Sequence, residues 1–144
     1  MTNILARNHA LLNQFGENIT IFPVESGTTI KEGDFVVVNT RTMLATLPRK
    51  ESGYYTVGCA IRLITAQNGT TYVICKDGVF NFRNTRKYED KILKNDITRA
   101  CYFEDGNTVS LNNINTTKAG TVVGAYKKDI IVRVDVNEGS GVEW

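Results

Sequence analysis

Short apolar or alternating segments, each ended by turn residues, make up most of this chain. The pattern is clearest at residues 130–136, where Ile130, Val132 and Val134 share one face and Arg133 and Asp135 point to the other. This alternation predicts a half-buried strand. The same criteria predict further strands at residues 19–22, 35–39, 54–63, 71–75, 79–82, 99–103, 108–111 and 121–125.

Turn signals separate these segments. Asn68-Gly69 is the strongest, because both residue types tolerate positive φ and together favour a hairpin; Asp77-Gly78 and residues 127–129 predict further turns. Residues 84–95 are polar and predict a long loop or a short helix. Frequent turns with little helix predict an all-β fold, a mainly antiparallel small β-barrel or sandwich forming one domain over residues 18–136.

The two ends of the chain differ from this pattern. Residues 1–17 predict an N-terminal arm or short helix, with helical spacing of apolar side chains over 3–15, which would pack on the barrel or on a neighbouring subunit. Residues 137–144 predict a flexible tail, and its Trp144 is either a disordered remnant or an anchor in a neighbour's pocket. The expected contact residues to a partner subunit are Ile4, Leu5, Leu11, Leu12, Phe15 and Trp144.

Part of the sequence occurs twice. A turn, a strand, a loop and a Val-Gly strand follow one another from Ile30 to Ile61, and again from Ile92 to Tyr126. This predicts an internal duplication. In this alignment Gly33-Asp34 corresponds to Asn95-Asp96, with Gly or Asn in the left-handed conformation, and Gly58 corresponds to Gly124 at a strand bend or close backbone approach.

Charge and cysteine content limit the possible functions. Lys and Arg number 17 against 15 Asp and Glu, so the formal charge of +2 does not indicate a nucleic-acid binder. The basic stretch 83–94 predicts either a solvated loop or a surface for an acidic partner. The three cysteines, Cys59, Cys75 and Cys101, lie in apolar segments and predict buried free thiols in a reducing cytoplasm. We expect neither a signal peptide nor a membrane span.

Residues typical of catalytic and metal sites are sparse. His9 is the single histidine, the cysteines are not closely spaced, and the glycines are scattered, so we expect no enzyme activity, cofactor, metal or small-molecule substrate. Two alternatives stay open. A surface-displayed glycan-binding module would need exposed aromatic residues on one face, and a hydrolase would need a pair of carboxylates in one cleft. The candidate aromatic residues are Tyr54, Tyr55, Tyr72 and Tyr88.

The order and spacing of several motifs resemble the phage capsid cement, or head-decoration, proteins. The matching motifs are Lys31-Glu-Gly-Asp34 before Phe35-Val-Val-Val38, Val57-Gly-Cys-Ala60, Asp77-Gly-Val-Phe80, Asn95-Asp96 before Cys101-Tyr102, and Val123-Gly-Ala-Tyr126. The resemblance covers roughly residues 18–136. It implies a small β-rich virion protein made in the bacterial host cytoplasm and bound to the outside of the head. Its partners would be the major capsid protein, whose subunits it bridges, and copies of itself, commonly as trimers.

Overall fold

The computed structural model describes residues 19–135 of the 144-residue chain. The helix expected at residues 3–15, the tail expected at 137–144, and His9 lie outside the described residues. The same holds for every residue expected to contact a partner subunit: Ile4, Leu5, Leu11, Leu12, Phe15 and Trp144.

The first five strands form one antiparallel sheet, in the order β1-β5-β4-β2-β3. Their bounds are β1 (Ile19–Pro23), β2 (Phe35–Asn39), β3 (Ala45–Thr46), β4 (Tyr54–Thr65) and β5 (Thr71–Lys76). A single parallel bridge between Val24 and Ala45 brings β3 back beside the end of β1. The sheet therefore curls until its two edge strands meet at this point.

The remaining strands form a closed barrel in the order β10-β6-β8-β7-β9. They are β6 (Gly78–Asn84), β7 (Ala100–Phe103), β8 (Thr108–Ser110), β9 (Lys118–Tyr126) and β10 (Asp129–Val134). Two short 3₁₀ turns, η1 (Tyr88–Asp90) and η2 (Lys94–Asp96), lie in the connection between β6 and β7. The predicted all-β class is confirmed. Each predicted strand has a counterpart, and the short strand β3 was missed.

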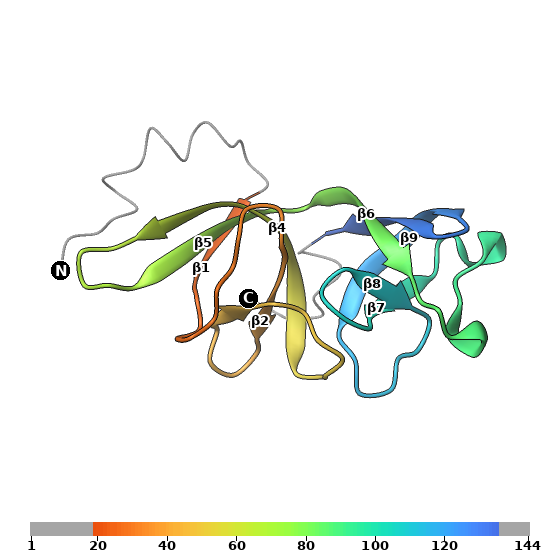
Figure 1. Cartoon of the computed structure of the whole chain (residues 1–144), viewed down its shortest axis with the longest axis horizontal. Coiled ribbons are helices and arrows are strands. Elements are labelled where there is room, and N and C mark those ends of the chain that lie inside the picture. The colour runs from red at the N-terminus through yellow and green to blue at the C-terminus, as the bar shows by residue number, and fades with distance from the viewer. Residues whose placement is uncertain (1–18, 136–144) are drawn as a thin grey trace.

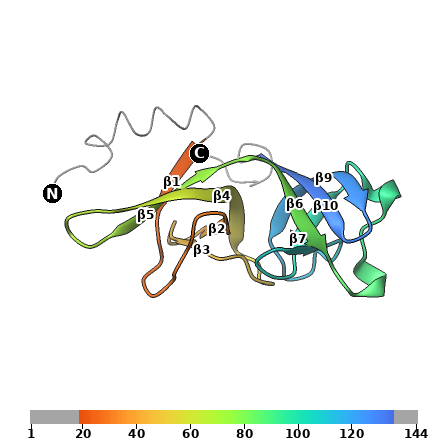
Figure 2. The same ribbon diagram turned by 45° about the horizontal axis from the view of Figure 1, so that its top comes forward.

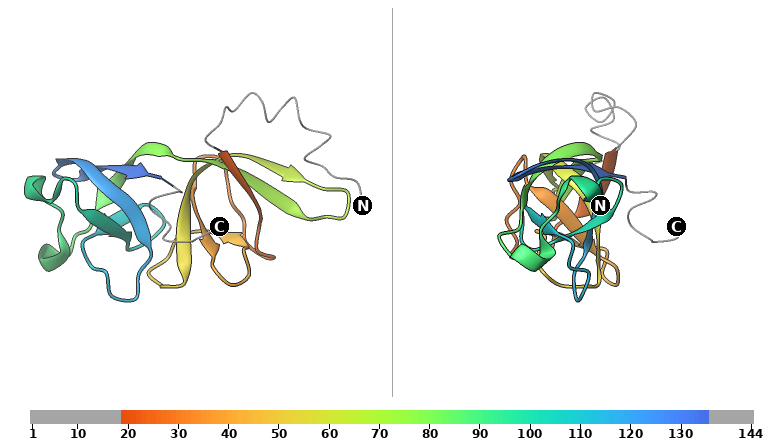
Figure 3. Two further views of the ribbon diagram at one scale, coloured as in Figure 1. Left: turned by 180° about the vertical axis from the view of Figure 1, so that it is seen from behind. Right: turned by 90° about the vertical axis from the view of Figure 1, so that its right-hand side faces the viewer.

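The strands divide into two units, unit 1 (β1–β5) and unit 2 (β6–β10), which lie side by side along the longest axis (Figure 1). Figure 2 and the left view of Figure 3 show the same separation from other directions, with β5 continuing into β6 across the top. Only Asp77 lies between β5 and β6, and β6 pairs with β10 and β8 instead of returning along β5. The expected single β domain is thus built from two units in tandem, and residues 77–78 join them.

The two units have the same topology, which confirms the predicted duplication. Strands β1 to β5 of unit 1 correspond in order to strands β6 to β10 of unit 2, and each pair of neighbouring strands in unit 1 has its counterpart in unit 2. The parallel contact between the end of β1 and β3 corresponds to the parallel pair β6–β8, which closes the barrel of unit 2. Hydrogen bonds repeat as well. Val24 N–H donates to the Thr71 carbonyl at 2.8 Å, and Asn84 N–H donates to the Lys128 carbonyl at 2.9 Å.

The structure corrects the alignment of the turn before β2. Gly33 N–H donates to the Ala60 carbonyl at 2.7 Å, and the equivalent bond in unit 2 runs from Thr98 N–H to the Val122 carbonyl at 2.7 Å. Gly33 therefore corresponds to Thr98, not to Asn95. Both occupy the left-handed region, with φ of 95° and 82°. The prediction was wrong because Thr98, unlike Gly or Asn, gives no sequence signal for this conformation.

A second correction concerns the glycine in the long strand of each unit. Gly58 lies opposite Val36, and Gly120 lies opposite Cys101. A Cβ atom at Gly58 or at Gly120 would collide with the carbonyl oxygen of the neighbouring strand, contributed by Lys76 or Arg133. Gly120, not Gly124, is therefore the counterpart of Gly58. Gly124 is also buried, but a Cβ there would meet side-chain atoms of Ile131 and Tyr126 at 3.2 Å or more, with no backbone oxygen closer.

Each unit has its own apolar core, and the two cores meet at β2. Phe35 of unit 1 stacks on Phe82 of unit 2 with ring centroids 4.0 Å apart, and it meets the edge of Phe80 at 5.6 Å. Hydrogen bonds add to this junction: the Thr56 hydroxyl donates to the Lys118 carbonyl at 2.7 Å, and the Thr117 hydroxyl donates to the Glu51 carbonyl at 2.7 Å. The two units are thus packed against each other in addition to being linked at Asp77.

Candidate binding surface

The residues singled out at turns have local structural partners. The Asp34 carboxylate accepts the Lys31 backbone N–H at 2.9 Å, so it closes its own turn. The buried Asp96 carboxylate accepts the Leu93 N–H at 2.7 Å and an Arg99 guanidinium N–H at 3.1 Å. Asp96 lines none of the grooves described below, and Asp34 lines a separate groove of about 330 Å³ together with Leu47 and Asn107.

Two glycines and one asparagine stand at connections between strands. Asn68 and Gly69 occupy the β4–β5 turn, where Gly69 has φ of 89°. Gly78 begins β6 with φ of 147°. Gly69 and Gly78 have positive φ and so determine the path of the chain, while Asn68 and Gly69 also line the groove of unit 1 described below.

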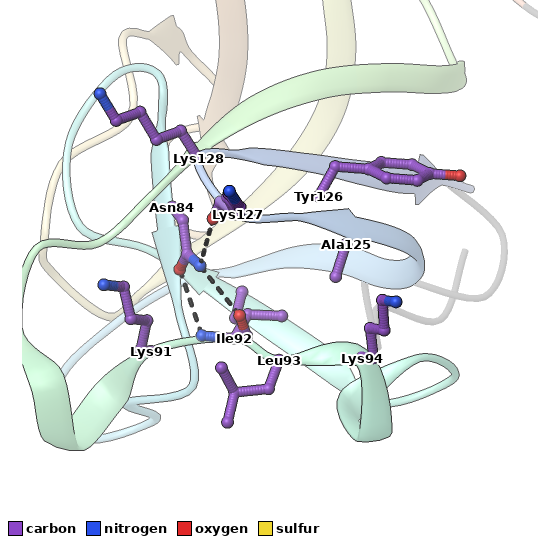
Figure 4. Close-up of a pocket in the computed structure, with 9 residues that line it drawn as sticks. All are labelled: Asn84, Lys91, Ile92, Leu93, Lys94, Ala125, Tyr126, Lys127 and Lys128. Carbon is purple, nitrogen blue, oxygen red and sulfur yellow. Dashed lines mark hydrogen bonds between the residues drawn. The ribbon is translucent and has the colours of Figure 1, made fainter.

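Two adjoining grooves lie at the end of unit 2, where the loop after β6 meets the β9–β10 turn. Their volumes are about 730 Å³ and about 770 Å³, and both are lined by Asn84, Lys91 and Lys128 (Figure 4). We call this end the basic surface, after the cationic side chains that line the two grooves: Arg83, Arg86, Lys91, Lys94, Lys127 and Lys128. Apolar side chains lie among them: Ile92, Leu93, Ala125 and Tyr126.

The buried side chain of Asn84 joins the two walls of this surface. Its amide nitrogen donates to the carbonyls of Ile92 at 2.9 Å and Lys127 at 3.1 Å, and its amide oxygen accepts the Ile92 N–H at 3.2 Å (Figure 4). Ile92 itself is only 2% exposed and packs in the core of unit 2. One polar side chain at the end of β6 therefore fixes both the loop and the turn.

Further bonds hold the loop between β6 and β7. Leu111 N–H donates to the Asp90 carbonyl at 3.0 Å, and the Thr85 hydroxyl donates to the Glu104 carboxylate. Together with the Asp96 contact to Leu93, these bonds order the backbone that carries the lysines. A preorganised backbone lowers the entropic cost of binding a partner.

Cations outnumber carboxylates along the two grooves, although Glu89 and Asp90 lie in the same loop as Lys91. Only one carboxylate, Asp129, lines the two grooves, and no lining cation forms an ion pair within residues 19–135. The resulting positive potential is concentrated at one end of a chain whose formal charge is only +2.

Unit 1 shows that the fold does not require these cations. Its equivalent end, between the β1 end and the β4–β5 turn, has a groove of about 410 Å³ lined by Ser, Thr, Gly, Asn and Val residues and by Glu25, with no Lys or Arg. By the strand pairing, Arg83 takes the place of Pro23, and Lys128 takes the place of Thr71. Two copies of one topology thus differ in the chemistry of this end.

Lys127 adds a second sign that the basic residues are not dictated by folding. It has φ of 57° in the two-residue turn between β9 and β10. That region costs a side-chain-bearing residue roughly 1–2 kcal/mol, and glycine or asparagine is the usual occupant. A lysine in this position therefore places a charge at the groove at some expense of stability.

The sequence indicated only part of this surface. The basic stretch 83–94 predicts either a solvated loop or a surface for an acidic partner. The sequence did not predict that Lys127, Lys128, Leu93 and Tyr126 line the same surface. The two consecutive lysines at a tight turn, Lys127 and Lys128, are the feature of the sequence that could have indicated this part of the surface. The contact between that turn and the loop arises only when β10 pairs with β6.

Other candidate chemistry is limited in the described part of the chain. The three cysteines are free thiols, and burial raises the pKa of Cys75 and of Cys101 to about 12. Tyr55, one of the tyrosines considered for a glycan site, is only 2% exposed and belongs to the core of unit 1. Among residues 19–135, no cluster of His, Cys, Asp or Glu side chains is arranged to hold a metal ion.

No helix within residues 19–135 is long and apolar enough to cross a membrane. Comparisons with protein-family models, with curated proteins and with solved structures each gave no match to this chain.

Proposed function

We propose that this chain is a structural virion protein that decorates the outer surface of a phage capsid and bridges subunits of the major capsid protein. The observation that carries the proposal is the tandem pair of units with one topology. A protein with two similar units packed together presents two surfaces at a fixed separation. Such a protein is suited to contact two neighbouring subunits of a repeating shell at once.

Bridging strengthens attachment without requiring a large contact in either unit. Once one unit is bound, the second binds at a high effective concentration, so the avidity exceeds the affinity of either contact. The stacked Phe35 and the hydrogen bonds of the Thr56 and Thr117 hydroxyls keep the two units packed together. The resemblance of several motifs to the cement proteins also supports the proposal. Apart from Asp77, which joins the units, these motifs lie within unit 1 or unit 2, although Gly58 and Gly124 are not equivalent positions there.

A sedimentation experiment tests this function. Purified protein is mixed with phage heads that lack it, the heads are pelleted, and bound copies per head are counted at increasing protein concentration. We expect saturable binding at a copy number that matches a symmetry class of the shell. A well-folded protein that stays in the supernatant at all concentrations would contradict the proposal.

A further inference from the structure

We propose that the basic surface of unit 2 binds an extended acidic segment of a partner protein that also carries apolar side chains. This inference rests on the proposed binding function and specifies the chemistry of the partner. It places the contact at the loop after β6 and the β9–β10 turn (Figure 4). Neither Phe35 nor Phe82, which stack at the junction between the units, lines these grooves.

Charge complementarity argues for an acidic occupant. The lining cations belong to two separate segments, 83–94 and 127–128, which meet across the grooves. Cations on both walls surround a bound chain from two sides, so carboxylates along an extended segment would each find a partner. Asp129 is the one lining carboxylate, and it contacts Asn81 at 3.4 Å.

Exposed apolar side chains argue for a protein occupant in place of a nucleic acid. Leu93 is 57% exposed and Tyr126 is 67% exposed, and both line the groove together with the buried Ala125. A single-stranded nucleic acid is usually held by aromatic platforms for successive bases, whereas this groove offers one tyrosine and an aliphatic side chain. Leucine or valine side chains of a peptide fit such a patch, while its carboxylates reach the lysines.

The difference between the units argues that this chemistry was acquired for binding. Unit 1 builds the same end of the fold without any lining cation, and unit 2 tolerates the left-handed Lys127. Because Asn84 and Asp96 fix the loop, the groove exists before a partner arrives. The partner segment therefore bears most of the ordering cost of binding.

Fluorescence anisotropy with defined probes tests the inference. The main probe is a labelled synthetic peptide in which Glu alternates with Leu. The comparison probes replace Glu by Gln, replace Leu by Ser, or use single-stranded oligothymidine of the same charge. The protein variants are Lys94→Glu/Lys128→Glu and, as a matched control, Lys50→Glu/Arg62→Glu, which reverses two exposed cations of unit 1.

We expect the Glu-Leu peptide to bind most tightly and the Lys94→Glu/Lys128→Glu variant to bind it about tenfold more weakly, because two surface pairs are lost and two repulsions are added. The control variant should bind as the unaltered protein does. Three results would each overturn the inference: no binding of the Glu-Leu peptide, an equal loss in both variants, or tighter binding of oligothymidine.

The same two variants, assayed for sedimentation with phage heads, separate this inference from the proposed function. Peptide binding without head binding would leave the inference standing and remove the capsid role. Head binding that persists unchanged in the Lys94→Glu/Lys128→Glu variant would leave the capsid role standing and overturn the basic surface as its contact. Circular dichroism of each variant establishes that loss of binding does not reflect loss of folding.

Discussion

Replacing Asn84 by alanine would release the loop after β6 and the β9–β10 turn from each other. The residue is 6% exposed, and its amide forms hydrogen bonds of 2.9, 3.1 and 3.2 Å to the backbones of Ile92 and Lys127. At a net 0.5–1.5 kcal/mol for each bond, the loss in the free energy of unfolding is roughly 1.5–4.5 kcal/mol. We expect a loss in the upper half of that range, because the substitution leaves backbone N–H and C=O groups without hydrogen-bond partners in a buried site.

Equilibrium urea unfolding measures this loss as a shift of the midpoint at constant slope. Asn81→Ala is a matched control, because Asn81 lies on the same strand, is exposed and makes a single 3.4 Å contact to Asp129. The control should change the free energy of unfolding by no more than about 0.5 kcal/mol. A similar small change for Asn84→Ala, or equal losses for both variants, would refute the assignment of Asn84 as the residue that joins the two walls.

Three further outcomes follow from the structure. Gly58→Ala should lower the free energy of unfolding by roughly 3 kcal/mol, because the added Cβ meets a carbonyl oxygen and the residue has a positive φ. Gly106→Ala should be nearly neutral, because the space around Gly106 is open. Urea unfolding compares the two variants. Lys127→Gly should raise the melting temperature, because relief of roughly 1–2 kcal/mol of backbone strain exceeds the roughly 0.5–1 kcal/mol that the greater freedom of glycine in the unfolded chain costs. The same change should weaken binding of the Glu-Leu peptide, and a lower melting temperature would contradict this reasoning. In the presence of a reductant, the stabilising effect of the two buried thiols on the free energy of unfolding should be complete below the ordinary thiol pKa of 9.0 and be lost as the pH rises toward about 12. The reason is that Cys75 and Cys101 stay protonated in the folded protein while the thiols of the unfolded chain ionise. Urea unfolding at increasing pH measures this decline, and alanine at both positions should make it less steep.

The local patterns of the sequence were sufficient to predict most strands. In β10 the buried Ile130, Val132 and Val134 alternate with the half-buried Ile131 and the exposed Arg133, as the sequence pattern predicts, and Asn68-Gly69 marks a turn that the structure contains. The short β3 was missed because two residues, Ala45 and Thr46, show no period. A strand can be predicted from the alternation of apolar and polar residues along it, provided that it is long enough to show that alternation.

The duplication was predictable in kind but not in register. The motif alignment matched Gly58 with Gly124, whereas the shared hydrogen-bond pattern matches Gly58 with Gly120. Backbone pairing, not residue identity, is what the two units have in common. The basic surface depended on this long-range pairing as well, because Lys128 reaches the loop at Lys91 only through the closure of β10 onto β6.

The position of Asp77 has a consequence for the ancestry of the chain. All strands of unit 1 precede it, all strands of unit 2 follow it, and no strand of one unit is inserted into the sheet of the other. Duplication and head-to-tail fusion of a gene for a half-length protein that paired with itself would produce a fold divided in this way. Fusion frees the two halves from having to share one sequence, so one end could keep a neutral turn while the other accumulated lysines.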